Sequence, residues 1–242
     1  MSSYQNKIEI KNVSKSFDDK QILKDINIQV EENQLVAILG PSGSGKSTIF
    51  NILTNIIKAD SGEVTVNGEI AYMYQKDMLV PWKKIIDNIG LPYIFKGKSK
   101  LEAREEVKKY LNTFGLDGYE NKYPMQLSGG MKQRANFLKT YLTSSDILLL
   151  DEPFGALDSI TRRHMQKWLL DLRVSMGSTI LFITHDIEEA IFLADKVYVI
   201  SESPAMIKGT IDVNLPIDRD GSIILSEEFI KNKKDILNIM TI

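Results

Sequence analysis

The stretch Gly40-Pro41-Ser42-Gly43-Ser44-Gly45-Lys46-Ser47-Thr48 fits the pattern G-x-x-x-x-G-K-[ST] without a mismatch. An apolar run over residues 35–39 precedes it and predicts a buried strand. Apolar residues at helical spacing follow, and they predict a helix that contains Ile49, Ile52, Leu53, Ile56 and Ile57. A strand, a glycine-rich loop and a helix in this order are the usual setting of a phosphate-binding loop. An ordinary glycine-rich turn is the weaker interpretation, because both flanks fit.

The residue types in this loop suit a nucleotide triphosphate. Glycine lets backbone N–H groups approach phosphate oxygens with no Cβ in the way. The helix that we expect to begin near Ser47 adds the positive end of its dipole. Lys46 is then expected against the β- and γ-phosphates, and the Ser47 hydroxyl is expected to help hold Mg²⁺.

Length and composition bound the remaining possibilities. The 242 residues suit one compact α/β domain with a smaller inserted subdomain, or at most two domains. There is no cysteine, which excludes disulfides and thiolate metal sites. A formal net charge of -2 gives no broad electrostatic footprint for nucleic acid. No apolar run is long enough to span a bilayer and the polar N-terminus is no secretory signal, so we expect any membrane role to come through a partner.

Two kinds of strand pattern predict two sheets. Alternating residues within 8–13, 26–30 and 64–66 indicate half-exposed antiparallel strands that form a small β subdomain. Continuous apolar runs at 147–150 and 179–183 indicate buried parallel strands, joined by a helix over 162–174. Between these regions we expect two further helices, one with a capping box at Ser99 and Glu102 and with Leu101 in its apolar stripe, and one over residues 128–142.

The predicted fold class is α/β, with a P-loop nucleotide triphosphatase core built on a mainly parallel sheet. We divide a single domain, residues 1–242, into a core with its β subdomain (1–75 and 146–204), an inserted helical subdomain (76–145) and a C-terminal appendage (205–242). The appendage carries little motif content beyond an amphipathic segment. Its sequence is compatible with a role in packing and with a role in regulation.

Two adjacent carboxylates, Asp151 and Glu152, end the apolar run 147–150. Ligands of open α/β sheets bind at the carboxyl ends of strands. One carboxylate on Mg²⁺ and a second that orients or deprotonates a water suit attack on a γ-phosphate. Solvated turn residues are the alternative, and the loop upstream makes it the weaker one.

The segment Leu127-Ser128-Gly129-Gly130-Met131-Lys132-Gln133-Arg134 is the third signal. Ser128 is a good N-cap, and the two glycines free the backbone at a helix N-terminus, where anions bind. A plain capped helix start explains the same residues, and spacing alone does not decide between the two interpretations.

Taken together, these segments resemble the nucleotide-binding subunit of an ABC transporter, over about residues 8–215. The resemblance is carried by GPSGSGKST, Gln75, LSGGMKQR, ILLLDEP, Gly155-Ala156-Leu157-Asp158 and His185. The LSGG element is highly specific to this family, whereas a phosphate loop alone is not. Met131 departs from the commonest signature, LSGGQ, which puts in doubt any polar contact that a glutamine would make.

The resemblance implies a head-to-tail dimer of two copies with two ATP molecules between them. Each phosphate loop, residues 40–48, would face the Ser128-Gly129-Gly130 turn of the other copy, with Asp158 at the seam. Lys46, Ser47 and Thr48 would bind phosphate and Mg²⁺. The other implied roles are Gln75 on Mg²⁺ and the attacking water, Asp151 as organiser of the metal, Glu152 as general base and His185 on the γ-phosphate.

Two aromatic or titratable residues have competing interpretations. The family implies that Phe17 stacks on adenine, whereas from sequence alone a core aromatic between two strands is about as plausible. His185 could cap the following helix, but Asp186, three residues before Glu189, is the better cap. We therefore expect His185 to be free for catalysis.

Three classes of function compete: an importer subunit, a soluble ABC ATPase that acts on ribosomes or nucleic acid, and a non-enzymatic nucleotide sensor. The segment Met78-Leu79-Val80-Pro81-Trp82 resembles subunits of nitrate, sulfonate, taurine and thiamine-precursor importers, in which this region receives a short helix of the membrane subunit. The alternative is that Trp82 and Leu79 fill the core of the helical subdomain. A sensor would be expected to lack Glu152 or His185.

We therefore expect an ATPase that uses ATP and Mg²⁺ and is bound peripherally at the cytoplasmic side of the cell membrane. Its expected partners are transmembrane permease subunits, an extracytoplasmic solute-binding protein and a second copy of itself, with no nucleic acid.

Overall fold

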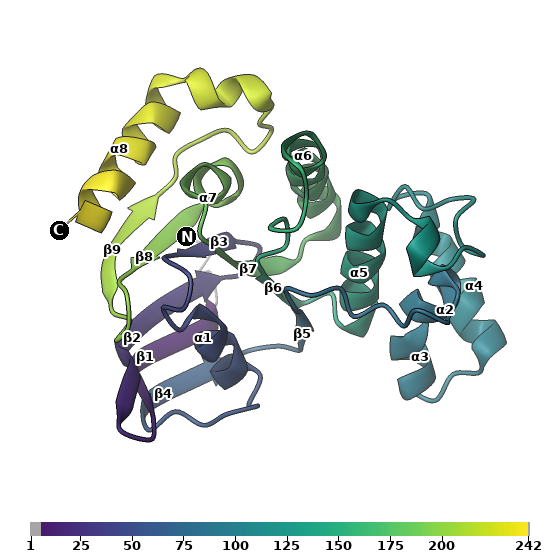
Figure 1. Cartoon of the computed structure of the whole chain (residues 1–242), viewed down its shortest axis with the longest axis horizontal. Helices are drawn as coiled ribbons and strands as arrows, with labels where there is room; N and C mark the ends of the chain where they lie inside the picture. The colour runs from purple at the N-terminus through teal and green to yellow at the C-terminus, as the bar shows by residue number, and fades with distance from the viewer. Residues whose placement is uncertain (1–5, 242) are drawn as a thin grey trace.

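The computed structural model describes residues 6–241, and its larger β-sheet has helices on both faces (Figure 1). The six strands of this sheet, in the order in which they lie side by side, are β5 (Ile70–Met73), β6 (Ile147–Asp151), β7 (Thr179–Thr184), β3 (Leu35–Leu39), β8 (Lys196–Ile200) and β9 (Ile207–Asp212). Neighbouring strands run parallel except for β9, which pairs antiparallel with β8. The prediction of a mainly parallel sheet is confirmed.

A second, antiparallel sheet has three strands in the order β2 (Lys20–Glu31), β1 (Asn6–Phe17) and β4 (Ser61–Val66). Its buried face carries the alternating residues of the sequence pattern, Ile8, Ile10, Val13, Ile26, Ile28 and Val30. Alternation places every second side chain on one face, so this face packs inward while the other meets solvent. The expected small β subdomain is confirmed as a sheet separate from the one that holds the phosphate loop.

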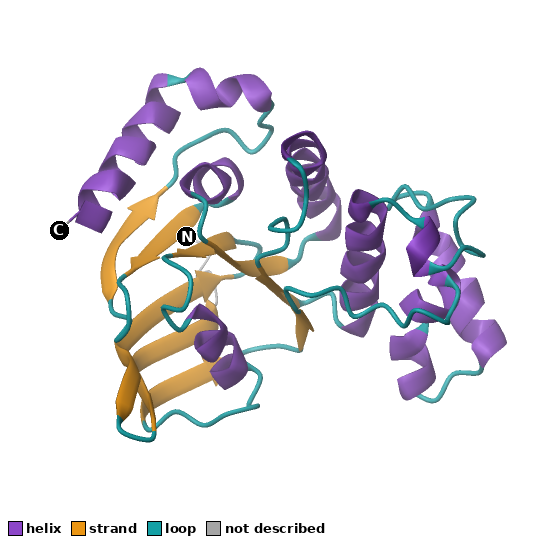
Figure 2. Ribbon diagram, viewed as in Figure 1, coloured by secondary structure: helices purple, strands orange, loops and turns teal. Residues whose placement is uncertain are grey.

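Eight α-helices are found within residues 6–241 (Figure 2). They are α1 (Lys46–Leu53), α2 (Ile85–Ile89), α3 (Leu91–Phe95), α4 (Lys100–Leu111), α5 (Gly129–Thr143), α6 (Ser159–Met176), α7 (Ile187–Leu193) and α8 (Glu227–Thr241). Figure 1 shows α1 and the small sheet on one side of the large sheet, with α6, α7 and α8 on the other. The helices α2, α3 and α4 form a lobe beyond α5.

The apolar strands β3, β6 and β7 are buried at every residue, because separate hydrophobic clusters cover the two faces of the sheet. Since these three neighbours run parallel, their carboxyl ends meet at the same edge. The segments that follow β3, β6 and β7 therefore converge there, and these are the segments that carry the motifs.

Two helix predictions need correction. The first helix ends at Leu53 and does not include Ile56 and Ile57. The Thr54 hydroxyl donates to the Phe50 carbonyl (2.9 Å), and Asn55 takes a left-handed φ of 57°, which turns the chain out of the helix. In α4, Leu101 is exposed rather than part of the buried stripe. It stands two positions before the buried Ala103, so at about 100° per residue it lies on the opposite side of the helix from the packed face.

Candidate nucleotide-binding site

The phosphate loop connects β3 to α1 as predicted, and two of its glycines are required by the geometry. Gly45 has a left-handed φ of 103°, and its carbonyl accepts from the N–H groups of Thr48 (3.0 Å) and Ile49 (3.3 Å). Gly40 has no room for a side chain, since a Cβ there would lie 2.5 Å from Cγ1 of Ile200. The loop is thus wrapped tightly over the N-terminus of α1, where backbone N–H groups favour an anion.

Lys46 is the first residue of α1, and the residue is only 5% exposed. Its ammonium donates to the carbonyls of Gly40 (2.9 Å) and Pro41 (2.7 Å), so it folds back over the loop. Burial lowers the pKa of Lys46, and the carboxylates of Glu152 and Asp151 oppose that shift. A cation held within the loop suits a bound phosphate.

Ser47 and Asp151 meet at the loop, as expected for a metal site. The Ser47 hydroxyl donates to Oδ2 of Asp151 (2.9 Å), and the Tyr72 hydroxyl donates to the same oxygen (3.0 Å). Burial raises the pKa of Asp151, while these two hydrogen bonds lower it. A divalent cation beside this partly desolvated carboxylate would favour its ionised form.

The donor set fits Mg²⁺ rather than a transition metal. Mg²⁺ is held by one or two oxygen ligands of the protein together with substrate phosphates and waters. The described residues hold no group of three or more His, Cys, Asp or Glu side chains that could bind a metal alone. Ser47 and Asp151 would therefore hold the ion jointly with phosphate oxygens.

Three neighbouring strands deliver Gln75, Glu152 and His185 to one point. Oε2 of Glu152 accepts from Nε2 of Gln75 (3.0 Å), and Oε1 of Glu152 lies 3.3 Å from Nδ1 of His185. Glu152 has a left-handed φ of 44°, and its N–H donates to the Ile183 carbonyl of the adjacent strand. Positive φ is uncommon for a residue other than glycine and is typical of functional positions. The helix-capping role falls to Asp186, which accepts from the N–H of Glu189 (3.1 Å).

Phe17 lies at the end of β1 and is 45% exposed, so the interpretation as a core aromatic is wrong. Its ring borders a cleft of about 440 Å³ whose other lining residues are Ile22, Ser42, Gly43, Gly45, Lys46, Ser47, Thr48, Gln75, Asp151 and Glu152. The structure thus brings the phosphate loop, an aromatic ring, two carboxylates and Gln75 into one cleft.

The remaining predicted residues gather at a different place, the N-termini of α5 and α6. Ser128 caps α5 by accepting from the Met131 N–H (3.3 Å), and Asp158 caps α6 by accepting from the N–H groups of Ile160 and Thr161. A Cβ on Gly130 would lie 2.8 Å from Cγ2 of Thr161, so the two helix starts pack closely. Among residues 6–241, neither Asp158 nor the Ser128-Gly129-Gly130 turn lines the cleft.

The methionine of the signature has an apolar environment. Met131 is partly buried and packs against the main hydrophobic core. At this position the side chain therefore makes a packing contact with the core.

A second surface follows Gln75. Trp82 is 78% exposed and Met78 is exposed, whereas Leu79 is buried, so the core interpretation holds for Leu79 alone. The loop is held by the fully buried Asn88, whose amide accepts from the Val80 N–H (2.6 Å) and donates to the Val80 carbonyl (3.1 Å). Sequence reasoning missed Asn88, because a lone polar residue in a short helix carries no pattern.

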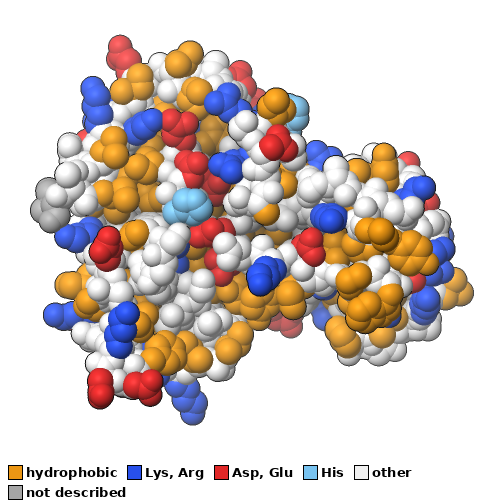
Figure 3. Space-filling model, in the orientation of Figure 1, with side chains coloured by type: hydrophobic (Ala, Val, Ile, Leu, Met, Phe, Trp, Pro, Cys, Tyr) orange, Lys and Arg blue, Asp and Glu red, His pale blue; other side chains and the backbone are white. Residues whose placement is uncertain are grey.

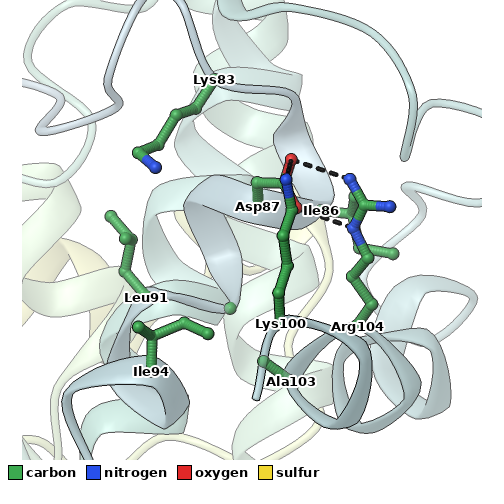
Figure 4. Close-up of a pocket in the computed structure, with 9 residues that line it drawn as sticks. Lys83, Ile86, Asp87, Leu91, Ile94, Lys100, Ala103 and Arg104 are labelled. Atoms are coloured by element: carbon green, nitrogen blue, oxygen red, sulfur yellow. Dashed lines mark hydrogen bonds and ion pairs between the residues drawn. The ribbon is translucent and has the colours of Figure 1, made fainter. Parts of the chain in front are cut away.

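Near this loop, α2, α3 and α4 enclose a pocket of about 180 Å³ (Figure 4). Its apolar lining includes Ile86, Leu91 and Ile94. At its rim, Arg104 makes a two-pronged ion pair with Asp87 (2.7 and 2.9 Å). Figure 3 shows hydrophobic side chains gathered over this lobe. Among residues 6–241, no helix has the length and apolar character needed to cross a membrane.

The fold and the cleft define a P-loop nucleotide triphosphatase. The family model for ABC transporter proteins matches residues 23–155, and the chain belongs to that family as an ATP-binding and ATP-hydrolysing member. The formylaminopyrimidine import ATP-binding protein ThiZ of Halalkalibacterium halodurans is 44% identical over 199 residues, which cover 81% of this chain and 79% of that protein. The aliphatic sulfonates import ATP-binding protein SsuB 1 of Shouchella clausii is 40% identical over 238 residues, with 98% and 92% coverage.

A solved structure supports the fold. The dimeric structure of a post-hydrolysis state of the ATP-binding cassette MJ0796, bound to ADP and Pi, matches with a TM-score of 0.73 and 28% identity. The match covers 86% of this chain and 100% of that chain.

Proposed function

We propose that this chain is the ATP-hydrolysing subunit of an importer for a small solute, bound peripherally at the cytoplasmic side of the cell membrane. The observation that carries the proposal is the placement of the exposed Trp82 loop directly after Gln75, whose side chain contacts Glu152. A partner that moves this loop therefore acts on the site of hydrolysis. The import names of ThiZ and SsuB 1 support the same class, with sulfonates or thiamine-precursor-like pyrimidines as the solute type.

The functional residues of the cleft, together with His185 beside Glu152, have the following proposed roles. Phe17 stacks on the adenine, residues 40–48 bind the phosphates with Lys46 as their counter-charge, and Ser47, Asp151 and Gln75 hold Mg²⁺. Glu152 accepts a proton from the attacking water, while Gln75 and His185 fix the two oxygens of its carboxylate. His185 also contacts the γ-phosphate.

The second group of residues supplies the other half of the site. The Ser128-Gly129-Gly130 turn at the N-terminus of α5 offers backbone N–H groups to a phosphate. Because this turn and Asp158 lie away from the cleft of their own copy, we propose that they complete the cleft of a second copy, arranged head to tail. The dimeric form of MJ0796 supports this arrangement.

The test is purification of the tagged chain from membranes of its native host in mild detergent. We expect a stoichiometric multi-spanning membrane protein, with an extracytoplasmic solute-binding protein as a further partner of the complex. Recovery of ribosomes or nucleic acid without a membrane protein would instead support the alternative, a soluble ABC ATPase.

A further inference from the structure

Arg162, in the first turn of α6, contacts two segments that carry proposed functional residues. Its Nη2 donates to the Leu157 carbonyl (3.0 Å), and Leu157 directly precedes Asp158. Its Nη1 lies 3.7 Å from Oδ2 of Asp186, which directly follows His185. One guanidinium thus connects the segment of Asp158 to the turn of His185.

The same side chain reaches the back of the hydrolysis site. Arg162 lines a small cavity of about 20 Å³ together with Glu152, Gly155, His185 and Glu189. Glu189 is only 5% exposed, and its carboxylate accepts from Nε2 of Gln166 (3.3 Å). The side chain of Arg162 is 32% exposed, and its inner side shares this cavity with Glu152 and His185.

The His185 turn is itself rigid. Oδ1 of Asp186 accepts from the Glu189 N–H at the start of α7, and the Asp186 N–H donates to the Thr184 hydroxyl (3.0 Å). Asp186 thus uses one carboxylate oxygen to cap α7 and presents the other to Arg162. Arg162 therefore adjoins a turn whose hydrogen bonds fix the backbone beside His185.

Helix stability does not account for an arginine at this position. The N-terminus of a helix carries the positive end of the dipole and favours acidic side chains. The first turn of α6 contains no acidic residue, and Arg162 lies there with its guanidinium turned to contacts outside the helix.

We propose that Arg162 is a positioning residue that makes hydrolysis depend on contact between the two copies. Contact of the second copy with the Asp158 segment fixes the Leu157 carbonyl, and Arg162 links that carbonyl to Asp186. The contact of His185 with Glu152 is thereby held in place. The inference rests on the proposed function, because it takes Asp158 to lie at the dimer seam.

The test compares Arg162→Ala and Arg162→Lys with Arg163→Ala, a matched control that removes the exposed arginine next along α6. Each change is made in the full chain for steady-state ATPase and in a Glu152→Gln background for ATP-dependent dimerisation. For Arg162→Ala we expect kcat to fall about ten- to a hundredfold, as small misplacements of catalytic groups do. ATP affinity and dimerisation should stay within about twofold of the parent.

Arg162→Lys should recover only part of kcat, because a single ammonium does not reproduce the two-sided contact of a guanidinium. Asp186→Asn is the second route to the same result, since asparagine still caps α7 but removes the charge that faces Arg162. The double variant that combines Arg162→Ala with Asp186→Asn should lose no more kcat than Arg162→Ala alone, because both changes break the same contact. Arg163→Ala should match the parent in every assay.

Unchanged kcat in Arg162→Ala would overturn the proposal. Loss of dimerisation in proportion to kcat, with a lowered Tm, would also overturn it and leave Arg162 a merely structural residue. If Glu152→Gln with Arg162 intact fails to dimerise with ATP, the proposed function itself fails, and that result is separate from both.

Discussion

At the scale of the residue, Glu152 is held through its backbone and through both oxygens of its carboxylate. Its backbone has a left-handed φ of 44° and is bonded to β7, and its two carboxylate oxygens face Gln75 and His185. Its side chain is 14% exposed, so an attacking water could reach it. A strained backbone conformation of this kind persists only where the surrounding contacts hold it in place.

We expect Glu152→Gln to lower ATP turnover by at least about a hundredfold, because the amide keeps the shape of the side chain but does not accept the proton. ATP affinity should change by less than about twofold, since Glu152 is not a phosphate ligand. Steady-state hydrolysis and equilibrium nucleotide binding check the two expectations. Glu105→Gln, an exposed position on α4, is the control. Normal turnover in Glu152→Gln would remove this residue as the base.

Glu189 gives the fold a pH dependence. Burial raises the pKa of Glu189 to about 7 from an ordinary 4.5, so the folded protein binds a proton that the unfolded chain releases. Stability therefore falls as pH rises from about 4.5 through about 7, and the loss is complete above that range. Glu189→Gln removes this dependence on pH, so the Tm of the variant minus that of the parent should increase between pH 5 and pH 8. A difference in Tm that is constant with pH would contradict the assignment.

The roles of residues in local motifs could be predicted from the sequence. The roles of residues whose partners are distant in the sequence could not. Lys46, Ser47, Asp151 and Glu152 follow from short spacings next to apolar strands. Tyr72 carries no such signal, because its partner Asp151 lies 79 positions away in the chain. Asn88 and Arg162 were missed for the same reason: their importance depends on which carbonyls and carboxylates the folded chain brings to them.

At the scale of the element, the C-terminal segment is where sequence patterning was least informative. Strand β9 escaped prediction, since a half-exposed edge strand with a glycine has no continuous apolar run. Arg219 is almost fully buried, and its Nη1 donates to the carbonyls of Ile191, Phe192 and Ala194 at the end of α7. The segment therefore packs as part of the core and closes the helix that follows His185.

The Trp82 loop is an element whose shape does not depend on its most exposed side chain. Asn88 and the buried Leu79 hold it, so Trp82→Ala should leave folding and the ATPase activity of the isolated chain unchanged. In the assembled importer we expect the same substitution to uncouple hydrolysis from uptake, because a large exposed aromatic is typical of a contact that dominates an interface. Solute uptake and ATP consumption in reconstituted vesicles measure the coupling ratio. Full uptake by Trp82→Ala would exclude a coupling role.

At the scale of the whole molecule, the proposed nucleotide contacts fall into two groups that one copy does not bring together. The first group lines the cleft at the carboxyl ends of β3, β5 and β6, and the second lies at the N-termini of α5 and α6. Sequence motifs identified both groups, but only the folded chain separates them in space. We propose that head-to-tail pairing of two copies completes both clefts at once.

The most direct measurement is the molar mass of Glu152→Gln in solution by light scattering, with ATP and with ADP, for the Ser128 form and for Ser128→Arg in the same background. We expect ATP, but not ADP, to produce a dimer of the Ser128 form, and we expect Ser128→Arg to remain a monomer although its own phosphate loop is intact. A dimer that Ser128→Arg does not affect, or a monomer at every ATP concentration, would contradict the shared site.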